Sequence, residues 1–171
     1  MALPKKLKQM NLYNDGGSYV GQCKSVTLPT LGRKLESFRG AGMDGPVKVD
    51  LGHSDDGIQI EWTLGGWDLT MLRQFGAVQA DGVMLRWAGS VQQDDTGAVT
   101  AVEVVARGRH EEIDFGDAES GEDTEHSITT TCSYYKLSVG GNVEIEIDLL
   151  NFVFIVNGED RLAEHRKAIG L

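Results

Sequence analysis

The sequence of 171 residues has no apolar run near the ~18 residues that a membrane-spanning helix requires. Its first residues, MALPKKLKQMNLYNDG, are basic but lack the apolar stretch of a secretory signal, so we expect assembly in the cytoplasm. Only two cysteines are present, Cys23 and Cys132, and their spacing is not that of a metal site. In a reducing compartment we expect both to stay free thiols that pack as small apolar residues.

The sequence also has no excess of basic residues over acidic ones. The chain has 16 Lys and Arg residues against 26 Asp and Glu residues, giving a formal net charge of −10 at pH 7. Proteins that bind nucleic acid need a basic surface to neutralise phosphates, so this charge argues against that class. It remains compatible with a surface along which DNA passes without adhering, because like charges repel.

No residue pattern typical of an enzyme or a metal site is present. His110–Glu112 resembles the start of the zinc motif HExxH, but no second histidine follows one helical turn later. The pairs Asp55–Asp56 and Asp94–Asp95 lack the alternating ligands of a calcium loop, so we interpret them as turns. No serine lies in a GxSxG setting. We therefore expect no catalytic residue, no metal site and no cofactor.

The dominant pattern is an alternation of apolar and polar residues, which is typical of strands with one buried face. Strands are predicted at Ser18–Leu28, Ile58–Leu64, Val83–Ala88, Ala98–Arg107, Ser127–Leu137 and Val143–Asp148. Helices are predicted at Asp68–Val78, with Asp68 as a cap, and at Glu159–Ile169, which stops before Gly170. The sequence thus predicts one mainly β domain over residues 1–171. Its expected form is a β-sandwich or partly closed barrel with one mid-chain helix and a C-terminal helix.

The stretch from Leu28 to Gly57 departs from this pattern because it is long and rich in glycine and charge. A structureless connection of this length is rare in a compact domain unless it has a role. A flexible linker would also lack large apolar residues. The stretch contains Leu35, Phe38, Met43, Val47, Val49 and Leu51. A long surface loop is one interpretation; we favour an arm, at about residues 32–57, that buries these side chains on another subunit.

Acidic residues recur at the polar positions of the predicted strands, namely Glu61, Glu103, Glu144, Glu146 and Asp148. A sheet with one solvated face explains them. In a ring-shaped assembly the same face would line a central channel, and the sequence leaves both interpretations open. The segment Gly108–Asp123 is also acidic and is predicted to be irregular.

Two segments carry the most specific resemblance to a known family: KSVTLPTLGRKLESFRGAGMDG at residues 24–45 and NGEDRLAEHRKAIGL at residues 157–171. Further matching segments are LPKKLKQMNLYNDGGSYVG, EWTLGG and EIDLLNFVFIVNG. Through them the chain resembles, from end to end, the major tail tube proteins of contractile-tailed phages, including the tube of R-type pyocins.

This resemblance implies a structural protein of the virion rather than an enzyme. Members of the family form six-membered rings that stack into a hollow tube, and inner strands of all subunits join in one lumen barrel. The implied partners are further copies of the chain and the tail sheath, tape measure, baseplate and tail-terminator proteins. DNA would pass through the lumen without specific binding. The resemblance does not separate a phage from a genome-free bacteriocin particle.

Within this expectation, ring stacking is assigned to the arm and to the N-terminal segment, residues 1–17. The predicted stacking residues are Leu3, Leu7, Leu12, Phe38, Arg39, Met43, Val47 and Val49. The residues predicted to line the lumen are Glu61 and Glu103. Two alternatives remain: the tube protein of a type VI secretion system, which shares the architecture, and a β-sandwich module that binds a ligand such as carbohydrate.

Overall fold

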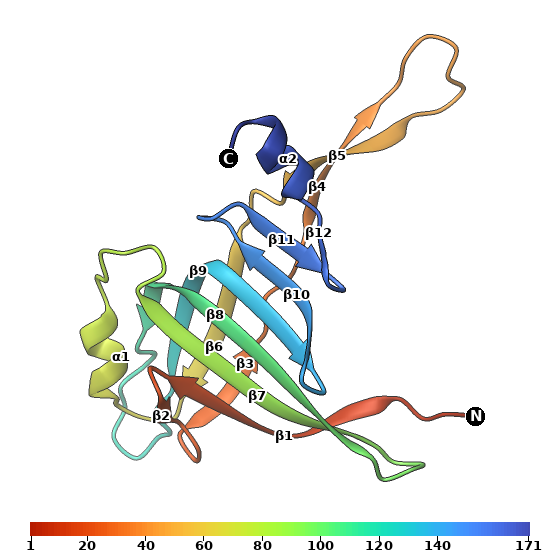
Figure 1. Cartoon of the computed structure of the whole chain (residues 1–171). Coiled ribbons are helices and arrows are strands. Elements are labelled where there is room, and N and C mark those ends of the chain that lie inside the picture. The colour runs from red at the N-terminus through yellow and green to blue at the C-terminus, as the bar shows by residue number, and fades with distance from the viewer.

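The computed structural model describes all of residues 1–171, which form a mainly antiparallel β structure with two short helices (Figure 1). The strands are β1 (Lys5–Asn14), β2 (Gly17–Ser18), β3 (Cys23–Thr27), β4 (Arg33–Phe38), β5 (Val47–His53), β6 (Ile58–Leu64), β7 (Val83–Gln93), β8 (Val99–Asp114), β9 (His126–Val139), β10 (Asn142–Asp148), β11 (Val153–Val156) and β12 (Glu159–Asp160). The helices are α1 (Leu69–Gln74) and α2 (Ala163–Ala168). Neither helix is long and apolar enough to cross a lipid bilayer.

The large sheet has the strand order β12-β11-β10-β9-β8-β7-β1-β2, and β6 and β3 join it through β9. One edge of β9 is shared: residues 126–132 pair with β6, whereas residues 134–139 pair with β10. β8 follows the opposite edge of β9 along nearly its whole length. The sheet therefore folds back on itself, and β3 and β6 lie behind β7 and β8 in Figure 1. No ladder joins β1 to β3, so the barrel stays open.

The core lies between these two walls because the strands alternate in burial. In β6 the buried residues are Ile58, Ile60, Trp62 and Leu64, while the residues between them face outward. The Trp62 ring stacks on Tyr19 at 5.6 Å, and its indole N–H donates a hydrogen bond to the hydroxyl of Thr130 at 3.1 Å. An aromatic side chain with a satisfied polar atom thus fixes the centre of the core.

A buried polar network attaches α1 to one end of the sandwich. The amide of Asn14 donates to the Tyr19 hydroxyl at 3.1 Å and to Gln74 Oε1 at 2.7 Å. The Tyr19 hydroxyl donates to Asp68 at 2.6 Å, and the same carboxylate caps α1 by accepting from the Met71 N–H. The side chains of Asn14, Tyr19 and Asp68 in this network therefore all have hydrogen-bond partners, as burial requires.

The predicted mainly β sandwich or partly closed barrel, with a mid-chain and a C-terminal helix, is confirmed, but several boundaries differ. Helix α1 is shorter than predicted, because the backbone is already extended at Phe75 and Gly76 follows in a left-handed conformation (φ 87°). Glu159 and Asp160 form β12 by pairing with β11, so the last helix begins only at Ala163. The predicted irregular segment after Gly108 is strand as far as Asp114.

At Gly108 the backbones of β8 and β9 leave no room for a side chain. A Cβ atom at this position would lie 1.9 Å from the carbonyl oxygen of Thr131 and 2.7 Å from Cα of Cys132. Backbone cannot yield as a flexible side chain does, so we expect Gly108→Ala to lower the free energy of unfolding by at least about 2 kcal/mol in urea titrations. Gly45→Ala is the matched control, since no atom lies within 4 Å of its Cβ position. Equal stability of the two variants would contradict this account.

His110 is buried, with Nδ1 2.9 Å from the Thr130 hydroxyl, and burial lowers its pKa to about 4. Below about pH 6.5, the ordinary pKa of histidine, the unfolded chain therefore binds a proton at His110 that the folded chain does not bind. The free energy of unfolding is therefore highest above about pH 6.5 and falls as the pH drops toward about 4. Between pH 7 and pH 5 we expect a loss of about 2 kcal/mol from this group. Urea titrations at the two pH values should show a smaller loss for His110→Gln, and an unchanged loss would refute the assignment.

Candidate assembly surfaces

The stretch predicted as an arm is a hairpin, β4–β5, that projects from the body (orange in Figure 1). Its register places Phe38 opposite Val47 and Glu36 opposite Val49, so these residues share a face. Phe38, Val47, Val49 and Leu51, which we call the apolar strip, are 57%, 52%, 43% and 55% exposed. A two-stranded hairpin alone is at best marginally stable in water. The strip therefore needs a covering surface that this copy does not supply.

At the tip of the arm, Arg39 and Met43 close the loop. The Arg39 guanidinium donates to the carbonyl oxygens of Met43 at 3.3 Å and Asp44 at 2.9 Å. The N–H of Gly40 lies 3.1 Å from the Met43 sulfur. These two predicted stacking residues thus shape the tip, whereas Phe38, Val47 and Val49 present the apolar strip.

The base of the arm is held against β11 by aromatic contacts. The ring centres of His53 and Phe154 lie 4.8 Å apart in an edge-to-face arrangement, and the Arg33 guanidinium lies 5.0 Å over the Phe154 ring. Arg33 also donates to Asp50 at 3.0 Å, which lowers the pKa of that carboxyl. Burial and the nearby Arg33 charge lower the pKa of His53, so this imidazole stays neutral at pH 7.

The N-terminal segment contributes exposed leucines from residues before and within β1. Leu3 and Leu7 are 46% and 49% exposed, and the Leu3 N–H donates to Asp95 at 3.3 Å. Leu12 is different, because its side chain is fully buried in the core of its own chain. The prediction of Leu12 as a stacking residue is therefore wrong: strand alternation turns it inward.

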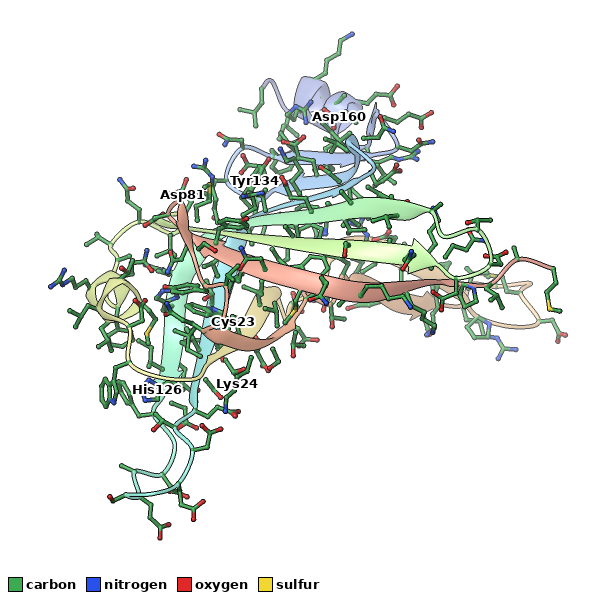
Figure 2. The ribbon with its side chains drawn as sticks, turned by 90° about the horizontal axis from the view of Figure 1, so that it is seen from below. Cys23, Lys24, Asp81, His126, Tyr134 and Asp160 are labelled. Atoms are coloured by element: carbon green, nitrogen blue, oxygen red, sulfur yellow. The ribbon has the colours of Figure 1, made fainter.

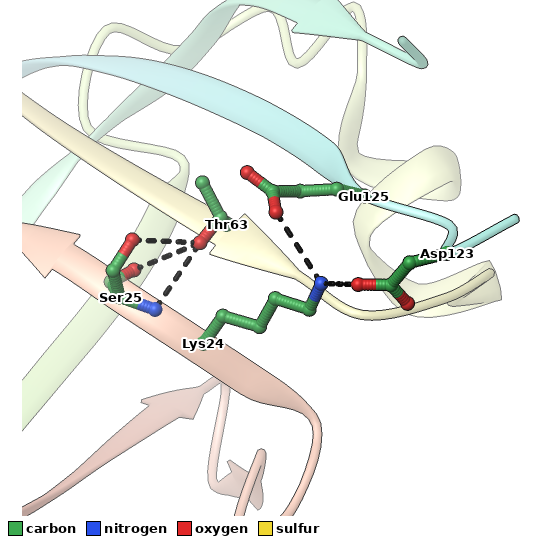
Figure 3. Close-up of polar contacts among 5 residues, drawn as sticks. All are labelled: Lys24, Ser25, Thr63, Asp123 and Glu125. Atoms are coloured by element: carbon green, nitrogen blue, oxygen red, sulfur yellow. Dashed lines mark hydrogen bonds and ion pairs between the residues drawn. The ribbon is translucent and has the colours of Figure 1, made fainter. Parts of the chain in front are cut away.

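A second surface, which we call the Thr-rich wall, is the outward face of β3, β6, the first half of β9 and the end of β8. Its residues are Ser25, Thr27, Gln59, Glu61, Thr63, Glu111, Glu112, Asp114, Ser127, Thr129 and Thr131. The hydroxyls of Ser25 and Thr63 are 2.8 Å apart across β3 and β6 (Figure 3). Gln59 donates to Glu111 at 3.0 Å. The wall is thus formed by short polar side chains and carboxylates.

Four of the wall residues are acidic, and Arg109, opposite Thr131 in the ladder, offsets one of these charges. Arg109 donates to the carbonyl oxygen of Val78 at 3.3 Å. Lys24, near the start of β3, pairs with Asp123 and Glu125 beyond the wall (Figure 3). The wall therefore presents a net negative potential.

Both edges of the Thr-rich wall are unpaired. β3 pairs only with β6. β7 pairs with β8 only from Val99 to Gly108, so residues 109–114 of β8 have a partner on one side alone. Free strand edges are templates for further pairing, and natural proteins normally cover them. This wall can therefore continue into another copy on both sides.

Glu103 lies on the other wall, formed by the outward face of β7–β10. Arg86 donates to Glu103 at 3.2 Å and also lies 3.9 Å over the Tyr13 ring. On the same face Tyr134 donates to Glu146 at 3.0 Å, and burial together with this carboxylate raises the tyrosine pKa to about 12. Figure 2 shows Tyr134 across the sandwich from Lys24. Glu61 and Glu103 therefore do not share a wall, contrary to the prediction that placed both along one lumen.

The cysteines are free thiols, Cys23 half-buried and Cys132 buried, as expected from the sequence. Burial raises the pKa of Cys132 to about 12, which leaves it unreactive at neutral pH. No group of three or more His, Cys, Asp and Glu side chains is arranged to hold a metal ion.

Comparison with known proteins points to one family. The family model described as phage tail tube protein FII matches residues 4–170. The tail tube protein of Escherichia phage P2 is 52% identical to this chain over 172 aligned residues, covering 100% of both chains. The major tail tube protein of Serratia phage KSP20 is 40% identical over 160 residues, covering 94% of this chain and 92% of its own.

The aromatic contacts at the arm base predict a measurable effect of Phe154. Phe154→Ala removes the ring that both His53 and Arg33 contact, contacts worth roughly 1–1.5 kcal/mol together. We expect the amides of β4 and β5 to exchange hydrogen about tenfold faster, while the amides of β8 and β9 keep their rates. Phe152→Ala is the control, because that exposed ring forms no aromatic pair or cation–π contact with the arm. An arm unaffected by Phe154→Ala would show that other contacts set its direction.

Proposed function

Because the chain belongs to the phage tail tube protein FII family, we propose that copies of it form hexameric rings that stack into the inner tube of a contractile phage tail. The observation that carries this proposal is that one copy leaves two surfaces incomplete: the apolar strip of the arm and both edges of the Thr-rich wall. The chain is a structural component of the virion, and its task is to assemble rather than to catalyse.

Ring closure uses the Thr-rich wall. Pairing the end of β8 in one copy with β3 of the next is a head-to-tail contact, and such contacts close into rings when the rotation allows. Each copy would contribute four strands to one continuous barrel, and no free edge would remain. The hexamer itself follows from the resemblance to tail tube proteins.

The barrel interior would then be the outward face of the wall, with Glu61, Glu111, Glu112 and Asp114 around the lumen. Against Arg109 these give a net charge of −3 per copy. Carboxylates repel DNA phosphates within a screening length of about 8–10 Å at physiological salt, which reaches far into a narrow channel. Short hydroxylated side chains offer no cationic group on which DNA could stall. The lumen would therefore conduct DNA during ejection without binding it.

Stacking uses the arm. Covering the apolar strip on the adjacent ring removes Phe38, Val47 and Val49 from water, and Leu3 and Leu7 of the N-terminal segment also contribute to the contact between rings. A contact of this kind does not close, so it continues as a tube. The tail sheath outside, the tape measure protein within, and the baseplate and terminator proteins at the ends are the partners that this role implies.

The two faces of the arm provide a matched test of stacking. Val47→Asp with Val49→Asp places two carboxylates on the apolar strip, whereas Ser37→Asp with Lys48→Asp places them on the opposite face. We expect the first variant to form soluble subunits or rings but no tubes in negative-stain micrographs, because buried carboxylates are costly. The second should form normal tubes. Normal tubes from both would exclude the strip as a stacking surface.

The lumen assignment is tested by two glutamates that lie on different walls. We expect Glu61→Lys to slow DNA ejection severalfold in a phage assembled with this chain, because six lysines would attract phosphates in the channel. Glu103→Lys should leave the ejection rate unchanged. A slowing caused by Glu103→Lys and not by Glu61→Lys would place the lumen on the wall formed by β7–β10.

A further inference from the structure

An apolar pocket of about 180 Å³ lies at the base of the arm, where the hairpin meets β10 and β11. Ile58 and Ile147, both buried, form part of its lining with Leu149 and Phe154. A dry apolar cavity of about 150 Å³ accepts a group as large as benzene, so this pocket has room for one aliphatic side chain. The chain itself leaves that space open.

The charges beside the pocket indicate what can enter it. The Arg33 guanidinium at the rim already binds Asp50, so its charge is compensated. A polar hollow of about 360 Å³ adjoins the pocket through Ser54 and Gly57, and it contains Asp56 and Glu61. Neither of these carboxylates has a cationic partner in the chain. The site therefore suits an apolar side chain that is followed closely by positive charge.

The N-terminal segment of the same sequence has this composition. Leu3 is 46% exposed and is followed by Lys5 and Lys6, neither of which forms an ion pair. No acidic residue precedes Asp15. The segment is also held in place, because the Leu3 N–H donates to Asp95. A segment that is already ordered loses less conformational entropy when it binds.

The position of the two features in the molecule makes the contact intermolecular. In Figure 1 the N-terminus lies at the lower right and the arm at the upper right, well apart from each other. Copies stacked along the direction of the arm would bring the N-terminus of one copy to the arm base of the next. The C-terminal Leu171, 78% exposed, is the rival apolar group. It lies at the same end as the arm, so it would not face the arm base of the next copy in a stack.

We propose that, in the stacked tube, Leu3 of one copy occupies the arm-base pocket of a copy in the adjacent ring, with Lys5 beside Asp56. This inference rests on the proposed function, because it requires rings that stack. It adds a second contact between rings that the arm strip does not provide. The contact is head-to-tail, so it runs from ring to ring along the whole tube.

Disulfide crosslinking tests this contact directly. In a Cys23→Ser background, Leu3→Cys is combined with Leu149→Cys at the pocket, and assembled tubes are oxidised and separated on a non-reducing gel. A contact between rings gives a ladder of products that extends beyond six chains, whereas a contact within a ring stops at six. Each single-cysteine variant is the control and should give no ladder. Leu171→Cys with Leu149→Cys tests the rival occupant.

Normal tubes without a ladder from the Leu3 pair, or a ladder from the Leu171 pair alone, would overturn the proposal. If the double variant does not assemble, Leu3→Asp in the otherwise unmodified chain gives the second measurement, because a carboxylate is costly in an apolar pocket. It must raise the protein concentration needed for tube formation severalfold, and an unchanged concentration would also overturn the proposal. Failure of the unmodified chain to form any tube would instead refute the proposed function on which this contact rests.

Discussion

The structure depends on one constraint: a strand whose edge is unpaired leaves backbone donors and acceptors that require partners. Inside one copy, β9 meets this constraint by pairing with β8 on one side and with both β6 and β10 on the other. The fork bends the sheet into two walls and encloses Trp62 between them. At the outer strand β3 and the end of β8 the pairing stops, so these positions remain open to a neighbour.

The arm also leaves part of itself without a partner, but the uncovered part is an apolar face rather than a strand edge. Its two strands satisfy each other, but a hairpin has only one layer and cannot bury both of its faces. Phe38 and Val47 therefore stay exposed until a second surface covers them. His53, Arg33 and Phe154 fix the direction of the hairpin at its base, so the apolar strip is held in position before any partner arrives.

The polar interior has a separate task. Asn14, Tyr19, Asp68 and Gln74 connect a short helix to the end of the sandwich by hydrogen bonds rather than by apolar burial. Helix α1 has only six residues, too few to be stable alone. This network holds α1 in place, and the neutral His110, 3.0 Å from Gln74, links it to β8.

Sequence reasoning predicted much of this protein because strand alternation is a local property. The alternation of Ile58–Leu64 identified β6 and its buried face, and Asp68 was recognised as a helix cap. The resemblance to tail tube proteins, carried by the segments at residues 24–45 and 157–171, is confirmed by the family match. Other features depend on pairing partners and could not be predicted in this way. Glu159 and Asp160 form β12 rather than the start of a helix because they pair with β11. Leu12 points into the core because β1 pairs with β7.

By itself, then, the sequence determined the family, the mainly β class and the apolar residues that an arm must cover elsewhere. Only the tertiary structure decided which wall bears Glu61 and which bears Glu103, because both occupy the same polar phase of a strand and differ only in the sheet that carries them. The tertiary structure also places Glu111, Glu112 and Asp114 on the same wall as Glu61. The register shift between His110 and Glu112 determines which side chains at the end of β8 point outward. Alternation along a strand determines whether a side chain points into the core or outward. Which wall an outward side chain belongs to depends on pairing between strands that are distant in sequence.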